Sequence, residues 1–562
     1  MNLHFKYKLS SIKLGLTLIF IIGSSVLLKG QTIPVGGALD VQTRFGQLFG
    51  DKTSFSATIR PIGIQVLDSN QQEIIKPLLP TVLYKSNFLK NTQISVLPIS
   101  GVLSYNSHHP FGFNNGPIIP AKGLQTYLSA GLNVKLGPLE VQLNPEWVNA
   151  ENPYFPSYSE GRTDLEKINY FKFYNYIDFP ERFGDGKYNK IFPGQSFVKL
   201  NFGPVSVGYS TENLWWGPGV QNSLIMGNDA PGFQHLTIHT NKPIKTGIGS
   251  FEAQLIGGRL ESSKEPALQN SIVSTGHDLN PTFIGSWRYL SALNINYQPK
   301  WVPNLYLGFT RSFMAYESEL NGFKDYFPLF IRFQKFDVDQ DNFDRDQRLS
   351  FYTRWVFPKS NAEVYFEFGL NDNSYNFRDF IGSPDHSRAY QFGFSKLLPL
   401  NAHKKYISFN AEITQLSQTV DRLVRDAGGF YQHFQVRQGY THYGQNLGSG
   451  PGSGSNVAGL QVNFHKGLSN VGLKFQRIDR NVDFYEYFIN DLNQQSRKWV
   501  DFALGLNGQA AYKNLLFKVD ITGVKSLNYQ WRLKDYDPNA AYYTPKNDVF
   551  NFHGTLGLMY RF

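Results

Sequence analysis

Segments in which apolar and polar residues alternate recur along the chain from about residue 94 to its end. Side chains of an extended strand point alternately to opposite faces, so this pattern predicts strands with one apolar and one polar face. The hairpins around Gly137-Pro138 and Gly203-Pro204 show it best, because each joins two alternating segments through strong turn-forming residues. The pattern predicts an all-β protein.

Short turns join these segments in pairs. The eight short turns predicted from the sequence lie near 137–138, 203–204, 245–250, 299–304, 358–361, 399–404, 465–470 and 508–514. A first strand near 94–105 and a last strand over 552–562 bring the predicted total to about 18 strands. The last strand carries one apolar face, made of Phe552, Leu556, Leu558, Tyr560 and Phe562.

The connections between successive pairs are much longer than the turns within them. They cover 106–124, 144–196, 210–235, 257–287, 311–347, 371–388, 415–456, 477–498 and 523–550. Outer-membrane barrels have short periplasmic turns and long external loops, and a sheet in hydrocarbon must close so that all its backbone groups are paired. We predict a single antiparallel transmembrane β-barrel of about 18 strands in the outer membrane, with long extracellular loops and short periplasmic turns.

The amino-terminus has the features of a secretory signal peptide. Lysines precede an apolar run over 14–28, and we expect residues 1–30 to be removed. We predict that residues 31–93 form a periplasmic segment or a plug, and that residues 94–562 form the barrel. No later stretch reaches eighteen continuous apolar residues, which excludes transmembrane helices.

Composition excludes several classes of site. The chain has no cysteine, so it has no disulfide, no thiolate metal site and no lipidated amino-terminal cysteine. The formal net charge of +10 falls to +6 when the four lysines of the signal segment are removed. That excess is mild, and the sequence has no basic run or RNA-binding motif, so we expect no nucleic-acid partner.

Two adjacent tryptophans, Trp215 and Trp216, stand out in the connection 210–235. Flat aromatic faces beside amides such as that of Asn213 are suited to sugars, because the C–H faces stack while the hydroxyls hydrogen-bond. Trp147 offers a further ring in an earlier connection. The alternative is a structural wedge that packs a loop or a plug inside the barrel.

Cations and aromatic residues are mixed in the connection 415–456. Arg422, Arg425 and Arg437 lie there with Tyr440. A guanidinium pairs with a carboxylate through two parallel hydrogen bonds, so these residues could hold uronic-acid sugars. Alternatively, the arginines bind lipopolysaccharide phosphates or acids of the lumen.

Three other motifs predict less. The run 337–344 is similar to a calcium loop, but Asn342 and Arg348 replace its turn glycine and its bidentate glutamate, so we interpret it as a solvated acidic loop. Adjacent residues such as His108 and His109 point apart, which favours a structural role over metal binding. The acids of 144–196 could include a glycosidase pair, which only their separation would decide.

Several motifs together resemble the capsule assembly protein Wzi family. They are Glu212–Gly219 with Ser223–Ile225 and Asn228–Pro231, Asn106–Pro110, Asn144–Trp147 with Ala150–Asn152, Ser250–Arg259, Arg354–Pro358, Pro384–Tyr390 and Gly439–His442. The resemblance covers roughly residues 100–460 and implies an outer-membrane barrel of about 18 strands that holds capsular polysaccharide at the cell surface. It also implies a lectin-like protein that is neither a polymerase nor an exporter. The amino-terminal helical bundle of known members is not evident in 31–93.

We therefore predict a non-enzymatic outer-membrane barrel that binds and retains capsular or extracellular polysaccharide. The predicted contacts are Trp147, Asn213, Trp215, Trp216, Arg422, Arg425, Arg437 and Tyr440. The expected partners are this polysaccharide, outer-membrane lipid and lipopolysaccharide, and we expect a monomer without cofactor or metal. One alternative is a porin or substrate-specific channel with an open lumen. The other is a hydrolase of lipid or glycan, for which Ser107/His108 and Asp385/His386 are the close pairs.

Overall fold

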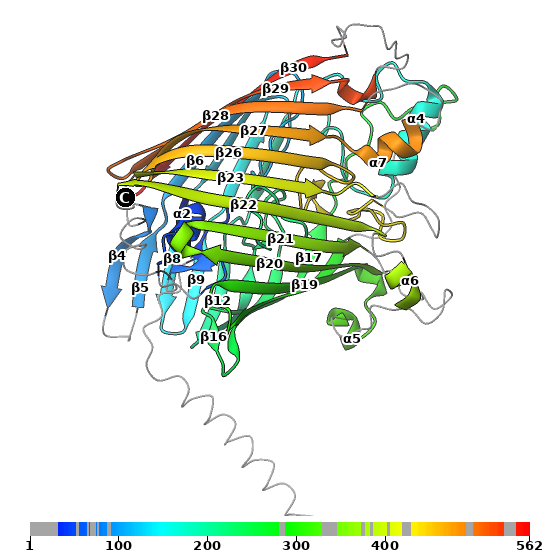
Figure 1. Cartoon of the computed structure of the whole chain (residues 1–562). Coiled ribbons are helices and arrows are strands. Elements are labelled where there is room, and N and C mark those ends of the chain that lie inside the picture. The colour runs from blue at the N-terminus through cyan, green and yellow to red at the C-terminus, as the bar shows by residue number, and fades with distance from the viewer. Residues whose placement is uncertain are drawn as a thin grey trace, which may run out of the picture.

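A computed structural model of the chain gives its fold (Figure 1). The structure describes residues 32–36, 38–51, 55–64, 67, 75, 78–86, 92–279, 287–328, 345–371, 377–382, 386–401, 405–418, 429–489, 498–532 and 547–562. The expected signal peptide, residues 1–30, lies outside these residues. In the described parts of the chain, no helix is long and apolar enough to cross a membrane.

One large antiparallel sheet of 24 strand segments organises the described residues. Its strands are β4 Thr81–Ser86, β5 Thr92–Val96, β6 Ile99–Asn106, β7 Gly123–Ser129, β8 Leu132–Leu136, β9 Leu139–Leu143, β10 Glu146–Ala150, β11 Tyr188–Phe192, β12 Phe197–Phe202, β13 Val205–Ser210, β15 His235–Thr240, β16 Ile244–Lys245, β17 Gly249–Glu261, β18 Trp287–Pro299, β19 Leu305–Tyr316, β20 Arg345–Phe357, β21 Ala362–Asn371, β22 Arg388–Asn401, β23 Lys405–Gln415, β26 Asn456–Lys466, β27 Ser469–Asp479, β28 Val500–Tyr512, β29 Leu515–Leu527 and β30 Val549–Tyr560. The prediction of an all-β, mainly antiparallel protein is confirmed.

Three two-stranded pairs lie apart from this sheet. They are β1 Thr32–Ile33 with β3 Ile62–Gly63, β2 Ile59–Arg60 with β14 Trp215–Trp216, and β24 Thr441–His442 with β25 Gln445–Asn446. The second pair joins the amino-terminal part of the chain to the tandem tryptophans, although about 155 residues separate them in the sequence.

The short turns predicted from the sequence join strands that pair with each other. All eight lie between antiparallel neighbours, namely β8–β9, β12–β13, β16–β17, β18–β19, β20–β21, β22–β23, β26–β27 and β28–β29. Gly137 and Gly203 each have a φ of +59°, a left-handed conformation that glycine adopts at little steric cost. Local alternation and turn chemistry therefore determine which neighbours pair.

Several strands continue across a short break into the next segment. β5 and β6 follow each other along the chain, and β5 pairs with β8 while β6 pairs with β7. β9 and β10 behave in the same way, since they pair with β12 and β11. At the other end of the chain, β30 pairs with β6 from His553↔Asn106 to Tyr560↔Ile99. The last strand therefore lies beside one of the first.

The two faces of the large sheet differ in polarity. We call one the exposed face, because it presents large apolar side chains, among them Leu103, Leu128, Leu200, Phe351, Leu473, Leu504, Phe552, Leu556, Leu558 and Tyr560. We call the other the covered face, because its side chains are buried and largely polar, among them Glu140, Lys199, Arg288, Asn294, Arg354, Glu363, Glu367 and Gln391. The apolar face predicted for the last strand lies on the exposed face. So large an exposed apolar surface requires an apolar environment around the sheet.

The long connections and most helices lie at one end of the sheet. Figure 1 shows α4 (Asp164–Tyr174), α5 (Phe323–Tyr326), α6 (Phe377–Gly382) and α7 (Val482–Phe484) at the end opposite the C-terminus. The short helical turns η3 (Glu317–Glu319), η7 (Tyr485–Ile489) and η9 (Tyr529–Trp531) belong to the same connections, whereas η6 (Pro358–Ser360) forms a short turn. One prediction needs correction: the connection 144–196 is shorter, because β10 and β11 extend into it and pair.

The described residues between 32 and 67 pack against the covered face. Their main element is α2 (Ala38–Leu48), which lies within the curve of the sheet (Figure 1). Leu48 is buried against Tyr306, Val356 and Leu397 of the sheet. The sequence did not predict this helix, because its apolar side chains find their partners on strands more than 250 residues away in the chain.

A buried ionic cluster attaches α2 to the sheet. Glu363 of β21 accepts hydrogen bonds from Arg44 Nε at 2.7 Å and from Arg354 Nε at 2.8 Å. Arg354 Nη1 also donates to Gln47 Oε1 at 2.6 Å and to the carbonyl of Ser56 at 2.8 Å. Because all three charged groups are buried, each depends on the others for its electrostatic compensation.

Candidate functional site

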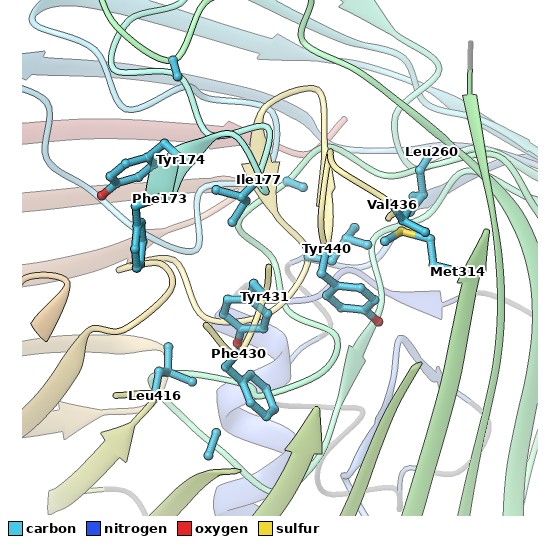
Figure 2. Packing of buried hydrophobic residues seen from close by; sticks show 14 of the residues in the cluster. Phe173, Tyr174, Ile177, Leu260, Met314, Leu416, Phe430, Tyr431, Val436 and Tyr440 are labelled. Atoms are coloured by element: carbon cyan, nitrogen blue, oxygen red, sulfur yellow. The ribbon is translucent and has the colours of Figure 1, made fainter. Parts of the chain in front are cut away.

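The tandem tryptophans lie inside the protein. Trp216 is fully buried, and its Nε1 donates to Gln254 Oε1 at 2.9 Å. It packs in an apolar cluster with Leu224 and Ile225 of its own connection and with aromatic residues from other connections. Figure 2 shows part of this cluster, in which Phe430, Tyr431 and Tyr440 lie near the centre. This position corresponds to the wedge interpretation of Trp216.

Trp215 and Asn213 are also held by other parts of the chain. The guanidinium carbon of Arg60 lies 4.6 Å from the centre of the Trp215 ring, which lines a cavity of about 410 Å³ near the short turns. The Asn213 side chain accepts from Gln195 Nε2 at 2.7 Å and donates to the Ala230 carbonyl at 2.8 Å. Both the oxygen and the nitrogen of the Asn213 amide therefore hold the connection 210–235 in place.

The remaining predicted contacts lie on different surfaces. Trp147 belongs to β10 and stands across from Leu128 and Ile191, which are on the exposed face. Tyr440 is buried, with the guanidinium carbon of Arg348 at 4.3 Å from its ring centre. Arg437 is half-buried in its loop. The other two predicted contacts, residues 422 and 425, lie outside the described residues.

A pocket of about 150 Å³ lies among the long connections, at the end of the sheet opposite the C-terminus. It is lined by described residues of six connections, which lie within 109–120, 155–183, 444–455, 480–481 and 529–531 and at positions 229 and 499. Its aromatic residues are Phe111, Phe113, Phe155, Tyr170, Tyr174, Phe179, Phe183, Trp499, Tyr529 and Trp531. The space holds several water molecules and so suits a ring-sized group.

Seven buried polar atoms in the wall of this pocket have no hydrogen-bond partner among the described residues. They are Asn114 Oδ1, Asp229 Oδ2, Gln445 Oε1, Asn446 Oδ1, Ser453 Oγ, Tyr529 Oη and Trp531 Nε1. Buried polar groups are nearly always hydrogen-bonded, so these atoms are suited to a ligand that brings many donors and acceptors. Aromatic faces beside such atoms are the arrangement that binds sugars.

Three connections that form the pocket are hydrogen-bonded to one another, and we call 107–122, 211–234 and 429–455 together the loop cap. The backbone N–H of Asn114 donates to Asp229 Oδ1 at 2.6 Å. Gln445 Nε2 donates to the carbonyl of Asp229 at 2.7 Å, and the N–H of Gly227 donates to the carbonyl of Leu447 at 2.6 Å. Asp229 therefore lies at the junction of the three connections.

The two acids of the pocket have raised pKa values. Burial raises the pKa of Asp229 to about 7, although the backbone N–H groups of Asn114 and Gly450 stabilise the charged form and lower the pKa. Burial also raises the pKa of Glu181 to about 7, although backbone N–H groups donate to both of its oxygens. Desolvation thus outweighs hydrogen bonding at both carboxyls, since burial disfavours the charged form.

We expect the loop cap to open more readily as the pH rises from about 5.5 to about 8.5. An acid with a raised folded pKa stabilises the fold fully below its unfolded pKa, and this stabilisation is lost as the pH rises through the folded pKa. For Asp229, raised from 3.8 to about 7, the loss over this range is about 2 kcal/mol, or about 30-fold in the opening constant. Hydrogen exchange of residues 429–455, corrected for the intrinsic pH dependence, measures it. Asp229→Asn cannot ionise and is the matched control; an equal pH response in both proteins would contradict the assignment.

The other motifs that the sequence suggested for metal binding or hydrolysis have structural roles wherever their residues are described. His109 packs against Tyr529 with ring centres 4.6 Å apart, and burial lowers its pKa to about 3. The Ser107 hydroxyl donates to Asn551 Oδ1 at 3.3 Å. Among the acids of 151–187, Glu166 closes a capping box with Thr163 at the start of α4. The possible calcium loop 337–344 lies outside the described residues, as does Asp385, and the described ones contain no group of three or more acids and histidines placed to hold a metal.

Three aromatic residues of the pocket were not predicted from the sequence. Trp499, Tyr529 and Trp531 lie in the last two long connections, where aromatic residues follow no motif. The ring centre of Trp499 lies 5.1 Å from that of Tyr529 and 5.2 Å from that of Trp531, although about 30 residues separate Trp499 from the other two in the chain. The signal available in the sequence was the recurrence of tryptophan in consecutive external connections, which the tandem pair at 215–216 obscured.

Comparisons with known proteins place these features in context. The sequence profile of the family described as capsule assembly protein Wzi matches residues 141–517. The chain is similar in structure to Wzi of Escherichia coli, which is described as an outer-membrane protein involved in group 1 capsule assembly and as a carbohydrate-binding β-barrel. That similarity has a TM-score of 0.60 at 11% identity and covers 94% of this chain and 99% of that one.

Weaker similarities extend to other solved structures. OccAB2 of Acinetobacter baumannii has a TM-score of 0.38 at 8% identity, and the match covers 85% of this chain and 100% of that one. OccK5 of Pseudomonas aeruginosa has a TM-score of 0.37 at 10% identity, with 84% and 99% covered. A search of curated proteins found no match.

Proposed function

This chain belongs to the capsule assembly protein Wzi family, and from that premise we propose that it is an outer-membrane β-barrel that binds and retains extracellular polysaccharide. The proposal has three parts: a sheet closed in lipid, an interior filled by the chain itself, and a sugar-binding pocket among the external loops. The protein acts by binding and not by catalysis, and the expectation of a monomer in contact with lipopolysaccharide stays a prediction.

The strand pairings support closure of the sheet. Five pairs of consecutive segments each continue one line: β5/β6, β7/β8, β9/β10, β11/β12 and β15/β16. Joining these and setting β4 aside leaves eighteen strands among the described residues, and the pairing of β30 with β6 completes the ring. The apolar exposed face then meets lipid, and every backbone group in the hydrocarbon layer has a partner.

The filled interior favours a binding protein over a porin. The described residues between 32 and 67 occupy the covered face near the short turns, and Trp216 with its apolar neighbours occupies the middle. The loop cap closes the end that faces outward in this orientation. Three successive layers of packed chain leave little room for a continuous aqueous path.

The observation that carries the sugar-binding part is the pocket itself. Ten aromatic residues line one ring-sized space at the external end, and seven residues of its wall carry an unpartnered buried polar atom. An apolar ligand would leave the polar atoms unpaired, and a small ion would not use the rings. A polysaccharide residue satisfies both, because a sugar ring has apolar C–H faces and a rim of hydroxyls.

Deletion of the gene tests the proposal. We expect polysaccharide to move from the cell surface to the medium while the total amount stays constant, since binding and not synthesis is lost. A strain carrying Trp499→Ala should shed polysaccharide as well, because losing one stacked ring costs roughly 1–2 kcal/mol, about tenfold in Kd. Trp301→Ala, at an exposed tryptophan of a short turn, is the matched control. Equal surface retention in the deletion strain and its parent would reject the function.

A further inference from the structure

We propose that the pocket recognises a carboxylate-bearing sugar and that Arg480 binds its carboxylate. The inference rests on the proposed polysaccharide binding and adds the class of sugar. Arg480 follows β27 directly and is the one arginine or lysine among the described residues that line the pocket. The neighbouring His109 stays neutral, because burial lowers its pKa to about 3.

The Arg480 side chain is held on three sides. Its guanidinium carbon lies 5.3 Å from the ring centre of Phe113 and 5.3 Å from that of Trp499. Its Nε donates to Asp501 Oδ2 at 2.8 Å, and its backbone N–H donates to the Trp499 carbonyl at 3.0 Å. A guanidinium fixed in this way loses little further side-chain entropy when a ligand binds.

Asp501 positions Arg480 and Trp499 together. While one of its oxygens accepts from Arg480, the other accepts from Trp499 Nε1 at 2.7 Å. The Asp501 side chain is fully buried, whereas the Arg480 side chain retains 14% of its exposure. Asp501 thus binds the Nε side of the guanidinium. The end that carries the two Nη groups is left to bind a ligand.

That remaining end matches a carboxylate. Two parallel N–H groups pair with the two oxygens of a planar carboxylate, and the adjacent Trp499 and Phe113 rings offer faces to the sugar that carries it. Among the pocket acids, Asp229 is the one suited to accept a sugar hydroxyl, since its Oδ2 has no partner among the described residues. A neutral sugar would leave the Nη groups of Arg480 without the anion that their geometry suits.

The test uses the full-length protein in detergent and the polysaccharide shed by the producing cells. One sample is left native, and in the other the carboxylates are reduced to alcohols with carbodiimide and borohydride, which keeps the backbone of the glycan. We expect the wild type to bind the native form at least about tenfold more tightly than the reduced form. In Arg480→Gln we expect weak binding and equal affinity for the two forms.

Three further variants make the test specific. Arg480→Lys keeps the positive charge but lacks the two parallel N–H groups of the guanidinium. Relative to Arg480→Gln, it should restore part of the preference for native over reduced polysaccharide. The double variant Arg480→Gln/Asp501→Asn removes both charges, so that no buried carboxylate is left uncompensated, and should behave as Arg480→Gln does. Arg477→Gln is the matched control, because Arg477 is a more exposed arginine of the same strand end that pairs with Asp479.

The outcomes separate this inference from the proposed function. Equal binding of native and reduced polysaccharide by the wild type would overturn the carboxylate assignment and leave polysaccharide binding intact. Loss of binding in Arg480→Gln without any effect of reduction would also overturn it, in favour of a phosphate or sulfate group. Absence of binding to either form by the wild type would instead reject the proposed function.

Discussion

Replacement of Glu363 by alanine should release α2 from the covered face of the sheet and make the protein conduct ions. Glu363 compensates two buried arginines, one on α2 and one on β20. Removing one member of a buried ionic cluster typically costs 3–5 kcal/mol, because the remaining charges stay desolvated without their partner. The cost falls on the contact between α2 and the sheet, since Arg44 is the residue that can leave. Single-channel recording in planar bilayers measures the result, with the wild type expected to stay closed.

The control for this prediction is another carboxylate of the covered face. Asp520 pairs with Lys474 at 2.6 Å, but both side chains are about a quarter exposed and neither pairs with α2. Asp520→Ala should therefore conduct no more than the wild type. A Glu363→Ala protein that does not conduct would show that the ionic cluster does not hold α2 on the sheet, and conductance in the wild type would revive the porin alternative.

Replacement of Trp216 by alanine should loosen the loop cap and abolish polysaccharide binding, although Trp216 does not line the pocket. The ring is fully buried in the central apolar cluster, and truncation of such a tryptophan costs 3–5 kcal/mol because a cavity remains. The connection 211–234 also carries Asp229, which joins the cap through Asn114 and Gln445. Faster hydrogen exchange in 107–122 and 429–455, together with loss of glycan binding, is the expected result.

Two matched variants separate a wedge from a sugar platform. Trp216→Phe keeps most of the apolar volume and loses the hydrogen bond to Gln254, which costs about 1 kcal/mol, so binding should survive. Trp215→Ala removes the neighbouring ring, which contacts Arg60 on the side of the other cavity, and should also leave glycan affinity unchanged. If Trp215→Ala instead weakened binding as strongly as Trp499→Ala, the tandem tryptophans would be part of the sugar site.

Much of the fold was predictable because its signals are local. Gly137 and Gly203 mark turns that only a few residue types form readily, and the strands beside them alternate with a period of two. The pairing of neighbouring strands, the apolar face of β30 and the end that carries the long connections all follow from such patterns. The limits of β10 and β11 were not predictable in this way, because each strand is defined by its pairing with the other and not by its local sequence.

The candidate site was less predictable. Trp215 and Trp216 are conspicuous in the sequence, yet neighbouring chain covers both rings in the structure. Trp499 and Arg480 are unremarkable in the sequence, and they become a candidate site only because Asp501 fixes both beside Phe113. Whether Arg437 contacts a ligand stays a prediction.

The sequence by itself determined a chain of paired antiparallel strands with one apolar face and with its long connections at one end. It did so because alternation and turn geometry act between residues close in the chain. Only the tertiary structure decided that α2 packs on the covered face and that six connections enclose an aromatic pocket. Those outcomes depend on burial and on electrostatic compensation between residues such as Arg44 and Glu363, 319 positions apart, and no local pattern encodes such contacts.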